Sequence, residues 1–233
     1  MNRKPNRKSD AAKVRRPNEP DRAKTGAGAK GPTDAPPAAL RIIGGVHRGR
    51  KLEYSGDPRT RPMKDRVREA VFNLLGPDVA GKFVIDLFAG TGALGLEALS
   101  RGASRALFLE QHFPSAEVIR RNTATLGLAD SARVMAADTF IHFRRGVKLG
   151  PEAEATPWVV FCSPPFEFYV SRRDDMLDLI GKLFAAAPGG SLFAVESDAR
   201  FDFDALPEAA EWDVREYPPA RVGIFHKPRM KHG

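Results

Sequence analysis

Apolar and polar positions between residues 82 and 196 follow two alternating periods. Short runs rich in Val, Ile, Leu and Phe are each followed by a longer stretch in which apolar residues recur every three or four positions. Such runs predict buried strands, the longer stretches predict amphipathic helices, and their order is typical of a doubly wound, mostly parallel α/β sheet. The expected strands are 82–88, 106–110, 132–138, 158–162 and 191–196, and the expected helices are 92–102, about 114–127, about 139–145 and about 172–186.

The segments on either side of this unit have different patterns. Two β-prone runs around Gly-Gly and Arg-Gly predict a basic hairpin over 41–54, and helical spacing of Val67, Val71 and Leu75 predicts a helix over 60–75. Two further strands near the end of the chain, joined by Pro-Pro, are expected to form an antiparallel edge pair. The segment 146–157 has the composition of a surface loop.

Charge divides the chain into three parts. Residues 1–39 carry ten Lys or Arg against four Asp or Glu, with no Ile, Leu or aromatic residue, so we expect a disordered basic tail. Residues 40–68 add nine basic against three acidic side chains, within a basic extension that we place at 40–76. The main domain is expected at 77–233. The basic block is interleaved with structured residues, which indicates a polyanionic partner such as a nucleic acid.

Several classes of protein are disfavoured by composition. The single cysteine, Cys162, excludes an internal disulfide and a zinc site built from cysteines, and His47 and His112 lack partners at metal-ligand spacing. No apolar run approaches the ~18 residues of a membrane span, and the N-terminus lacks a signal-peptide pattern. We therefore expect a soluble cytoplasmic protein, a monomer with no metal and no membrane partner.

Candidate chemistry lies where the predicted strands end, because ligands of open α/β sheets bind beyond the carboxyl ends of the strands. The first strand is followed by the glycine-rich stretch 86–95, which contains Gly90 and Gly92, and Asp86 stands at its start. Glu110 closes the second strand, where a carboxylate can accept hydrogen bonds from ribose hydroxyls. This pattern fits either NAD or S-adenosylmethionine, and glycines that only pack a helix on a sheet would produce it as well.

The fourth strand ends in Ser163-Pro164-Pro165-Phe166, a motif that a nicotinamide enzyme has no evident need for. An exocyclic amine of a base is a poor nucleophile, because its lone pair is delocalised into the ring. Acceptors placed around its N–H groups favour attack on a methyl group, and the Ser163 side chain and the Pro164 carbonyl can supply them. The two prolines hold the loop and Phe166 can stack on a flipped base, so these four residues are the predicted catalytic group.

The sequence resembles the RsmD-type 16S ribosomal RNA guanine-N2 methyltransferases over about residues 41–196. The matching stretches are RGRKL (48–52), TRPMKDRVREAVFNLL (60–75), DLFAGTGALGLEALSRGA (86–103), FLEQ (108–111) and SPPF (163–166). The resemblance implies a Rossmann-like class I fold, S-adenosylmethionine as the cofactor, and 16S rRNA or the small ribosomal subunit as the partner. It also implies methyl transfer to N2 of a guanine.

The resemblance further implies a role for particular residues of this chain. Two groups are expected to hold the cofactor: Asp86, Phe88, Gly90 and Gly92 around its methionine end, and Glu110 at the ribose with Asp138 at the adenine. Phosphate contacts supply much of the affinity of RNA-binding proteins, so the basic block is expected to bind RNA. Its predicted RNA-binding residues are Arg48, Arg50, Arg61, Arg66 and Arg68.

The chain departs from the family pattern at Met63, where Thr is usual, and at Ser163, where Asp or Asn is usual. Asp and Asn both offer an acceptor oxygen, whereas only Asp is a base, so the position needs hydrogen-bond acceptance. The Ser163 hydroxyl can accept but falls short by about one bond length, and Glu167 is a candidate substitute. Two alternatives stay open: a cofactor- and RNA-binding homologue with weak or no turnover, and an amino-methyltransferase for another substrate.

Overall fold

The computed structural model describes residue 1 and residues 40–54, 56–57 and 62–229. The predicted tail at 1–39 and Arg61 fall outside this part of the chain, apart from Met1. Within the described part, no helix is both long and apolar enough to cross a membrane.

The centre of the fold is a seven-stranded sheet in the order β3-β2-β1-β4-β5-β7-β6. The first five strands in this order are parallel, whereas β7 runs antiparallel to both β5 and β6. The predicted doubly wound sheet with an antiparallel edge pair is thus confirmed. The strands are β1 Phe83–Asp86, β2 Arg105–Leu109, β3 Ala132–Met135, β4 Trp158–Cys162, β5 Leu192–Ser197, β6 Asp213–Tyr217 and β7 Ala220–His226.

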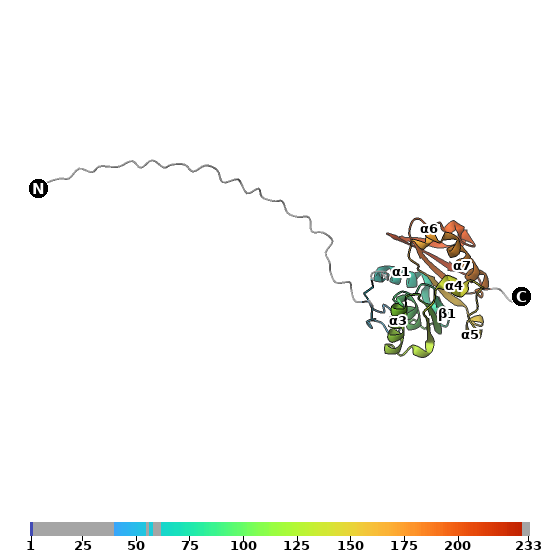
Figure 1. Ribbon diagram of the computed structural model, residues 1–233, viewed down its shortest axis with the longest axis horizontal. Helices are drawn as coiled ribbons and strands as arrows, with labels where there is room; N and C mark the ends of the chain where they lie inside the picture. Colours follow the sequence, from blue (N-terminus) through green and yellow to red (C-terminus); the bar gives the residue numbers. More distant parts are fainter. Residues whose placement is uncertain (2–39, 55, 58–61, 230–233) are drawn as a thin grey trace. The chain divides into compact units, whose positions relative to one another are not determined.

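Helices cover both faces of the sheet, as the near-continuous burial of β1 and β4 requires (Figure 1). One face packs against α1 Asp65–Leu75, α2 Ala93–Ser100 and α3 Phe113–Thr125, together with Leu40, Ile42 and Leu52 of the N-terminal segment. The other face packs against α4 Thr139–Phe143, α5 Pro151–Glu154, α6 Phe168–Ser171 and α7 Arg173–Ala186. The short 3-10 helices η1 to η4 cover 76–79, 129–131, 203–205 and 209–211.

Three local predictions differ from the structure. Strand β3 ends at Met135, so Asp138 follows the strand and caps α4, where its side chain accepts a bond from the Ile141 amide at 3.0 Å. The stretch 146–157 is not only a surface loop, because it contains α5, whose Ala153 is fully buried and accepts a 2.6 Å bond from the Trp158 indole. The third difference is the hairpin.

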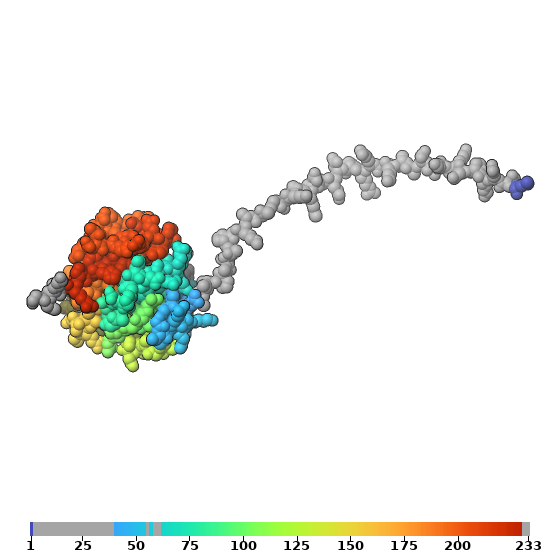
Figure 2. Space-filling view, turned by 180° about the vertical axis from the view of Figure 1, so that it is seen from behind, coloured from blue at the N-terminus to red at the C-terminus, as the bar shows by residue number. Residues whose placement is uncertain are grey.

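The predicted hairpin at 41–54 is an antiparallel loop with a single bridge between Arg41 and Lys51 and no regular strand. The amides of Ile42 and Leu52 bond across the loop, whereas those of Ile43 and Gly44 donate to the Glu97 carboxylate at 2.7 Å each. The amide of Val46 donates to the Ser100 carbonyl at 2.8 Å. The loop is therefore fixed to the C-terminal half of α2, and residues 40–54 (blue) and α1 (teal) lie beside each other in Figure 2.

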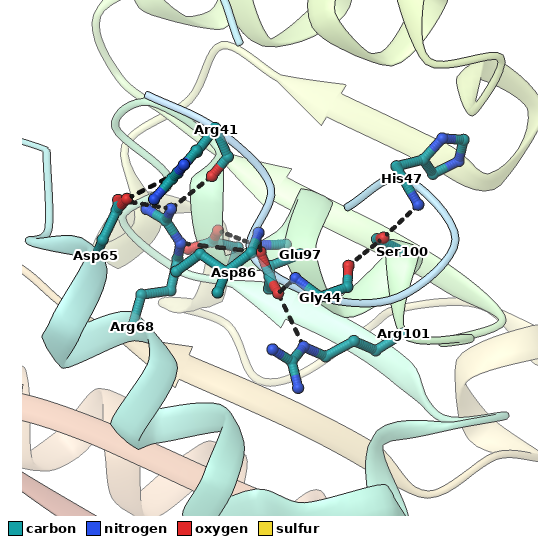
Figure 3. Close-up of polar contacts among 11 residues, drawn as sticks. Arg41, Gly44, His47, Asp65, Arg68, Asp86, Glu97, Ser100 and Arg101 are labelled. Atoms are coloured by element: carbon teal, nitrogen blue, oxygen red, sulfur yellow. Dashed lines mark hydrogen bonds and ion pairs between the residues drawn. The ribbon is translucent and has the colours of Figure 1, made fainter. Parts of the chain in front are cut away.

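Arg68 completes the attachment of this segment, as Figure 3 shows. Its side chain is fully buried and donates to the Arg41 carbonyl at 2.6 Å and to Asp65 at 3.0 Å, with Glu97 at 3.9 Å. The prediction that Arg68 binds RNA is therefore wrong. The residue lies on the buried face of α1, where it hydrogen-bonds to the 40–54 loop and to Asp65 of its own helix and forms an ion pair with Glu97 of α2.

Candidate active site

An open cleft of about 1160 Å³ lies beyond the carboxyl ends of β1 to β5, where an open α/β sheet is expected to bind ligands. Its walls come from the loops after these strands, from the start of α1 and from the turn between β6 and β7. Of the predicted cofactor and catalytic residues, the cleft is lined by Phe88, Gly90, Glu110, Asp138, Ser163, Pro164, Pro165 and Phe166.

The loop after β1 is held by Glu110 at the end of β2. One carboxylate oxygen of Glu110 accepts from the Gly90 amide at 2.8 Å, and the other accepts from the His112 amide at 2.7 Å. Gly90 has φ 54°, a conformation that favours glycine. Each carboxylate oxygen has a further lone pair, so Glu110 can bind hydroxyls while it fixes the loop.

Asp86 and Gly92 do not line the cleft, in contrast to the other predicted cofactor residues. Asp86 is buried and accepts a 3.1 Å bond from the Gly95 amide within α2. Burial raises the pKa of Asp86 to about 7, the Gly95 bond opposes this shift, and the charge of Glu110 adds to it. Asp86 therefore supports the glycine loop through its bond to α2 and does not face the cleft. Gly95 itself is a packing residue, since a Cβ there would lie 2.2 Å from the Phe108 ring.

Aromatic rings form a second wall of the cleft beside Asp138. Phe88, Phe140 and Phe168 pack against one another with ring centroids 5.7 to 6.1 Å apart. The Arg172 guanidinium lies 3.7 Å from the Phe140 centroid and 3.8 Å from the Asp138 carboxylate. The rings are inclined to one another by 55° to 71°, and with Asp138 they offer an apolar surface next to an acceptor, which suits a purine ring with an amino group.

The Ser163–Phe166 motif also lines the cleft. Pro164 is buried, Phe166 is half-buried, and Pro165 is exposed. The Pro165 carbonyl accepts from the Phe168 amide at 2.9 Å, which begins α6 directly after the motif. The described residues include no donor to the Pro164 carbonyl. That this oxygen accepts an N–H of the substrate amine therefore stays a prediction.

Sequence reasoning missed Glu196, which lines the cleft beside Ser163 and accepts a hydrogen bond from its hydroxyl. Burial raises the pKa of Glu196, and the Ser163 bond opposes that shift. The available signal was a charged residue at the end of the apolar run 191–196, as at Asp86 and Glu110. The candidate substitute Glu167 instead pairs with Arg200 at 2.9 Å on the surface.

The predicted RNA-binding arginines occupy different places. Arg66 is exposed and lines the mouth of the cleft, whereas Arg48 and Arg50 are exposed on the 40–54 segment. Arg50 also donates to the Thr125 carbonyl at 3.3 Å. Within the described ranges, no three His, Cys, Asp or Glu side chains are grouped so that they could hold a metal ion.

Solved structures share this architecture. The Escherichia coli protein yhhF has a TM-score of 0.64 and 32% identity, over 83% of this chain and all of that one. An RNA methyltransferase from Salinibacter ruber in complex with S-adenosyl-L-homocysteine has a TM-score of 0.50 at 18% identity, over 72% of this chain and 94% of that chain, so it supports the fold alone. The fold and its cleft thus define a class I methyltransferase, the class that uses S-adenosylmethionine.

Sequence comparison identifies the family. The model described as conserved hypothetical protein 95 matches residues 40–216. Ribosomal RNA small subunit methyltransferase D of Escherichia coli K12 is 41% identical over 187 residues, 79% of this chain and 87% of the relative. The enzyme of that name from Haemophilus influenzae is 36% identical over 134 residues, 58% of this chain and 67% of the relative. The chain belongs to this family, the RsmD family of S-adenosylmethionine-dependent ribosomal RNA methyltransferases.

Proposed function

We propose that this chain transfers the methyl group of S-adenosylmethionine to the exocyclic N2 of a guanine in the 16S RNA of the small ribosomal subunit. The observation that carries the proposal is the Ser163–Phe166 motif on the wall of the cleft, with the Pro164 carbonyl turned to no partner among the described residues. Such an acceptor suits the N–H of an amine better than a carbon nucleophile, which has no N–H to donate.

In this proposal the cofactor and the target guanine are bound by different residues of the cleft. Gly90 and Glu110 hold the methionine and ribose parts of the cofactor, and Asp138 with Phe88 and Phe140 receives the adenine. Phe166 stacks on the guanine taken out of its helix. Asp86 acts indirectly, because its bond to Gly95 fixes the start of α2 behind the glycine loop.

The RNA is proposed to approach across the N-terminal segment. Arg66 at the mouth of the cleft and Arg48 and Arg50 on the 40–54 loop are exposed cations on one continuous part of the chain. Phosphate contacts of this kind position the substrate without reading its sequence. A ribosomal substrate would place the reaction in the cytoplasm, and we expect the enzyme to act as a monomer.

The test is a transfer assay with labelled S-adenosylmethionine and small subunits isolated from cells that lack the cognate methylation. One guanine should be labelled, and mass spectrometry of the nucleosides should identify N2-methylguanosine. No label at any enzyme concentration, with cofactor and RNA still bound, would establish the alternative of a binding homologue. Label on DNA or on another RNA in a competition assay would establish a different substrate.

A further inference from the structure

Glu196 and Ser163 lie side by side because of the register of β4 and β5. Cys162 pairs with Val195 in the parallel ladder, so the next residue of each strand reaches the same edge of the sheet. The backbone of Glu196 is fixed from the other side, since the buried Tyr169 hydroxyl donates to the Glu196 carbonyl at 2.8 Å. The carboxylate is therefore held at the cleft by two neighbouring strands and by α6.

The Glu196 carboxylate has one hydrogen-bond donor among the described side chains. The Ser163 hydroxyl donates to its Oε2 atom, whereas Oε1 has no donor in the described part of the chain and the residue borders the cleft. A carboxylate in a partly buried site usually binds more donors than this. The arrangement leaves Oε1 as an acceptor for a ligand.

The position of Glu196 compensates for the shorter side chain of Ser163. A serine oxygen stands about one bond closer to the backbone than the oxygen of Asp or Asn. The Glu196 side chain, from the adjacent strand, places a carboxylate against that serine oxygen and on the side of the cleft. Together the two side chains supply what a single Asp or Asn supplies elsewhere: a fixed oxygen acceptor beside the Pro164 carbonyl.

We propose that Glu196 is a catalytic residue whose Oε1 atom accepts one N–H of the guanine amine while Pro164 accepts the other, with Ser163 as its positioning residue. This inference rests on the proposed function. The N2 lone pair attacks the methyl carbon, the carbon–sulfur bond breaks, and its electron pair stays on sulfur to give S-adenosylhomocysteine. The methylated nitrogen then releases one proton to water. Glu196 acts by accepting a hydrogen bond, so its role requires no proton transfer to protein.

The experiment compares four variants in single-turnover transfer to small subunits: Glu196→Ala, Glu196→Gln, Ser163→Asn and the Ser163→Asn/Glu196→Ala double variant. Loss of a preorganised acceptor should lower the rate of Glu196→Ala by about 10²- to 10³-fold. Glu196→Gln keeps an acceptor oxygen and should stay within about 10-fold of wild type. In the Ser163→Asn background, Asn supplies the acceptor, so the alanine substitution should cost less than about 10-fold.

The matched control is Glu167→Ala, which removes a carboxylate four residues after Ser163 that pairs with Arg200 on the surface. Its rate should equal that of wild type. Thermal unfolding of each variant checks folding, and Glu196→Met, of similar volume, replaces Glu196→Ala if the latter unfolds. If Glu196 only supports the fold, its loss should lower the melting temperature, and Ser163→Asn should not restore the transfer rate.

Two results would overturn the inference. If Glu196→Ala and Glu196→Met transfer methyl at the wild-type rate, Glu196 does not accept the amine, although the proposed function stands. If these variants weaken only cofactor binding, measured by calorimetry with S-adenosylhomocysteine, the carboxylate belongs to the cofactor site. If wild type and Ser163→Asn both fail to transfer, the proposed function itself fails, and the two failures are thus distinguishable.

Discussion

Glu97 and Glu196 are two glutamates withdrawn from solvent on the same chain, and their surroundings are opposite. The Glu97 side chain is fully buried and is bonded by two backbone amides and by Arg101 at 2.8 Å, with Arg68 close by (Figure 3). Glu196 is bonded by one hydroxyl and borders the cleft. A carboxylate whose donors are all internal stabilises the fold, whereas one with a free oxygen at a cleft is available for chemistry.

The largest effect on stability is expected from substitution of Glu97. Glu97→Ala removes the acceptor for Ile43 and Gly44 and leaves the Arg68 charge buried, so we expect a loss of about 3–5 kcal/mol in the free energy of unfolding. Urea denaturation measures it. Glu69→Ala, on the exposed side of α1, is the control and should change stability by less than about 0.5 kcal/mol. A Glu97→Ala protein as stable as the control would contradict the structural role.

The substitution Asp86→Asn tests whether ionisation of a buried carboxylate with a single amide donor lowers the free energy of unfolding. The Asp86 pKa of about 7 lies above the unfolded value, so its favourable contribution is complete below about pH 4 and is lost as the pH rises through about 7. The free energy of unfolding of wild type should therefore fall relative to Asp86→Asn over this range, by at most about 4 kcal/mol. Urea denaturation at a series of pH values measures the difference, and parallel profiles would refute it.

Glu196 should give a smaller effect of the same sign. Its pKa is also raised by burial, so ionisation opposes folding once the pH exceeds the value of the unfolded chain. Glu196→Gln is expected to be as stable as wild type at acidic pH and more stable near neutral pH, the opposite of a substitution at Glu97. Thermal unfolding of Glu196→Gln and wild type at an acidic and a neutral pH measures the difference in stability. A variant less stable than wild type at both pH values would show that Glu196, like Glu97, stabilises the fold.

The arginines of α1 give the smallest expected effect. Arg66 is exposed at the cleft and Arg68 is buried two residues away. Arg66→Ala should leave stability unchanged, weaken RNA binding, and reduce the slope of log affinity against log salt by about 1. Filter binding at several salt concentrations measures this slope. An unchanged slope would remove Arg66 from the proposed RNA-binding surface.

Prediction of the fold succeeded because strands and helices have local signatures. The apolar runs that became β1, β4 and β5 and the helical spacing of α1 were all found, since burial on one or both faces of an element leaves a period in the sequence. The boundaries were less accurate at β3, which ends three residues early, and the short helix α5 has too few residues to show a period.

Local sequence patterns predict the α/β order, the glycine loop, Glu110 and the Ser163–Phe166 motif, because each depends on residues that are close together in the chain. The folded structure is needed to see that Arg68 is buried against Glu97, that Asp86 lies beneath the cleft, and that Glu196 meets Ser163. The physical reason is the same in each case. These contacts join side chains of different elements, and the parallel register that brings β4 and β5 together across about 30 residues leaves no period in either strand.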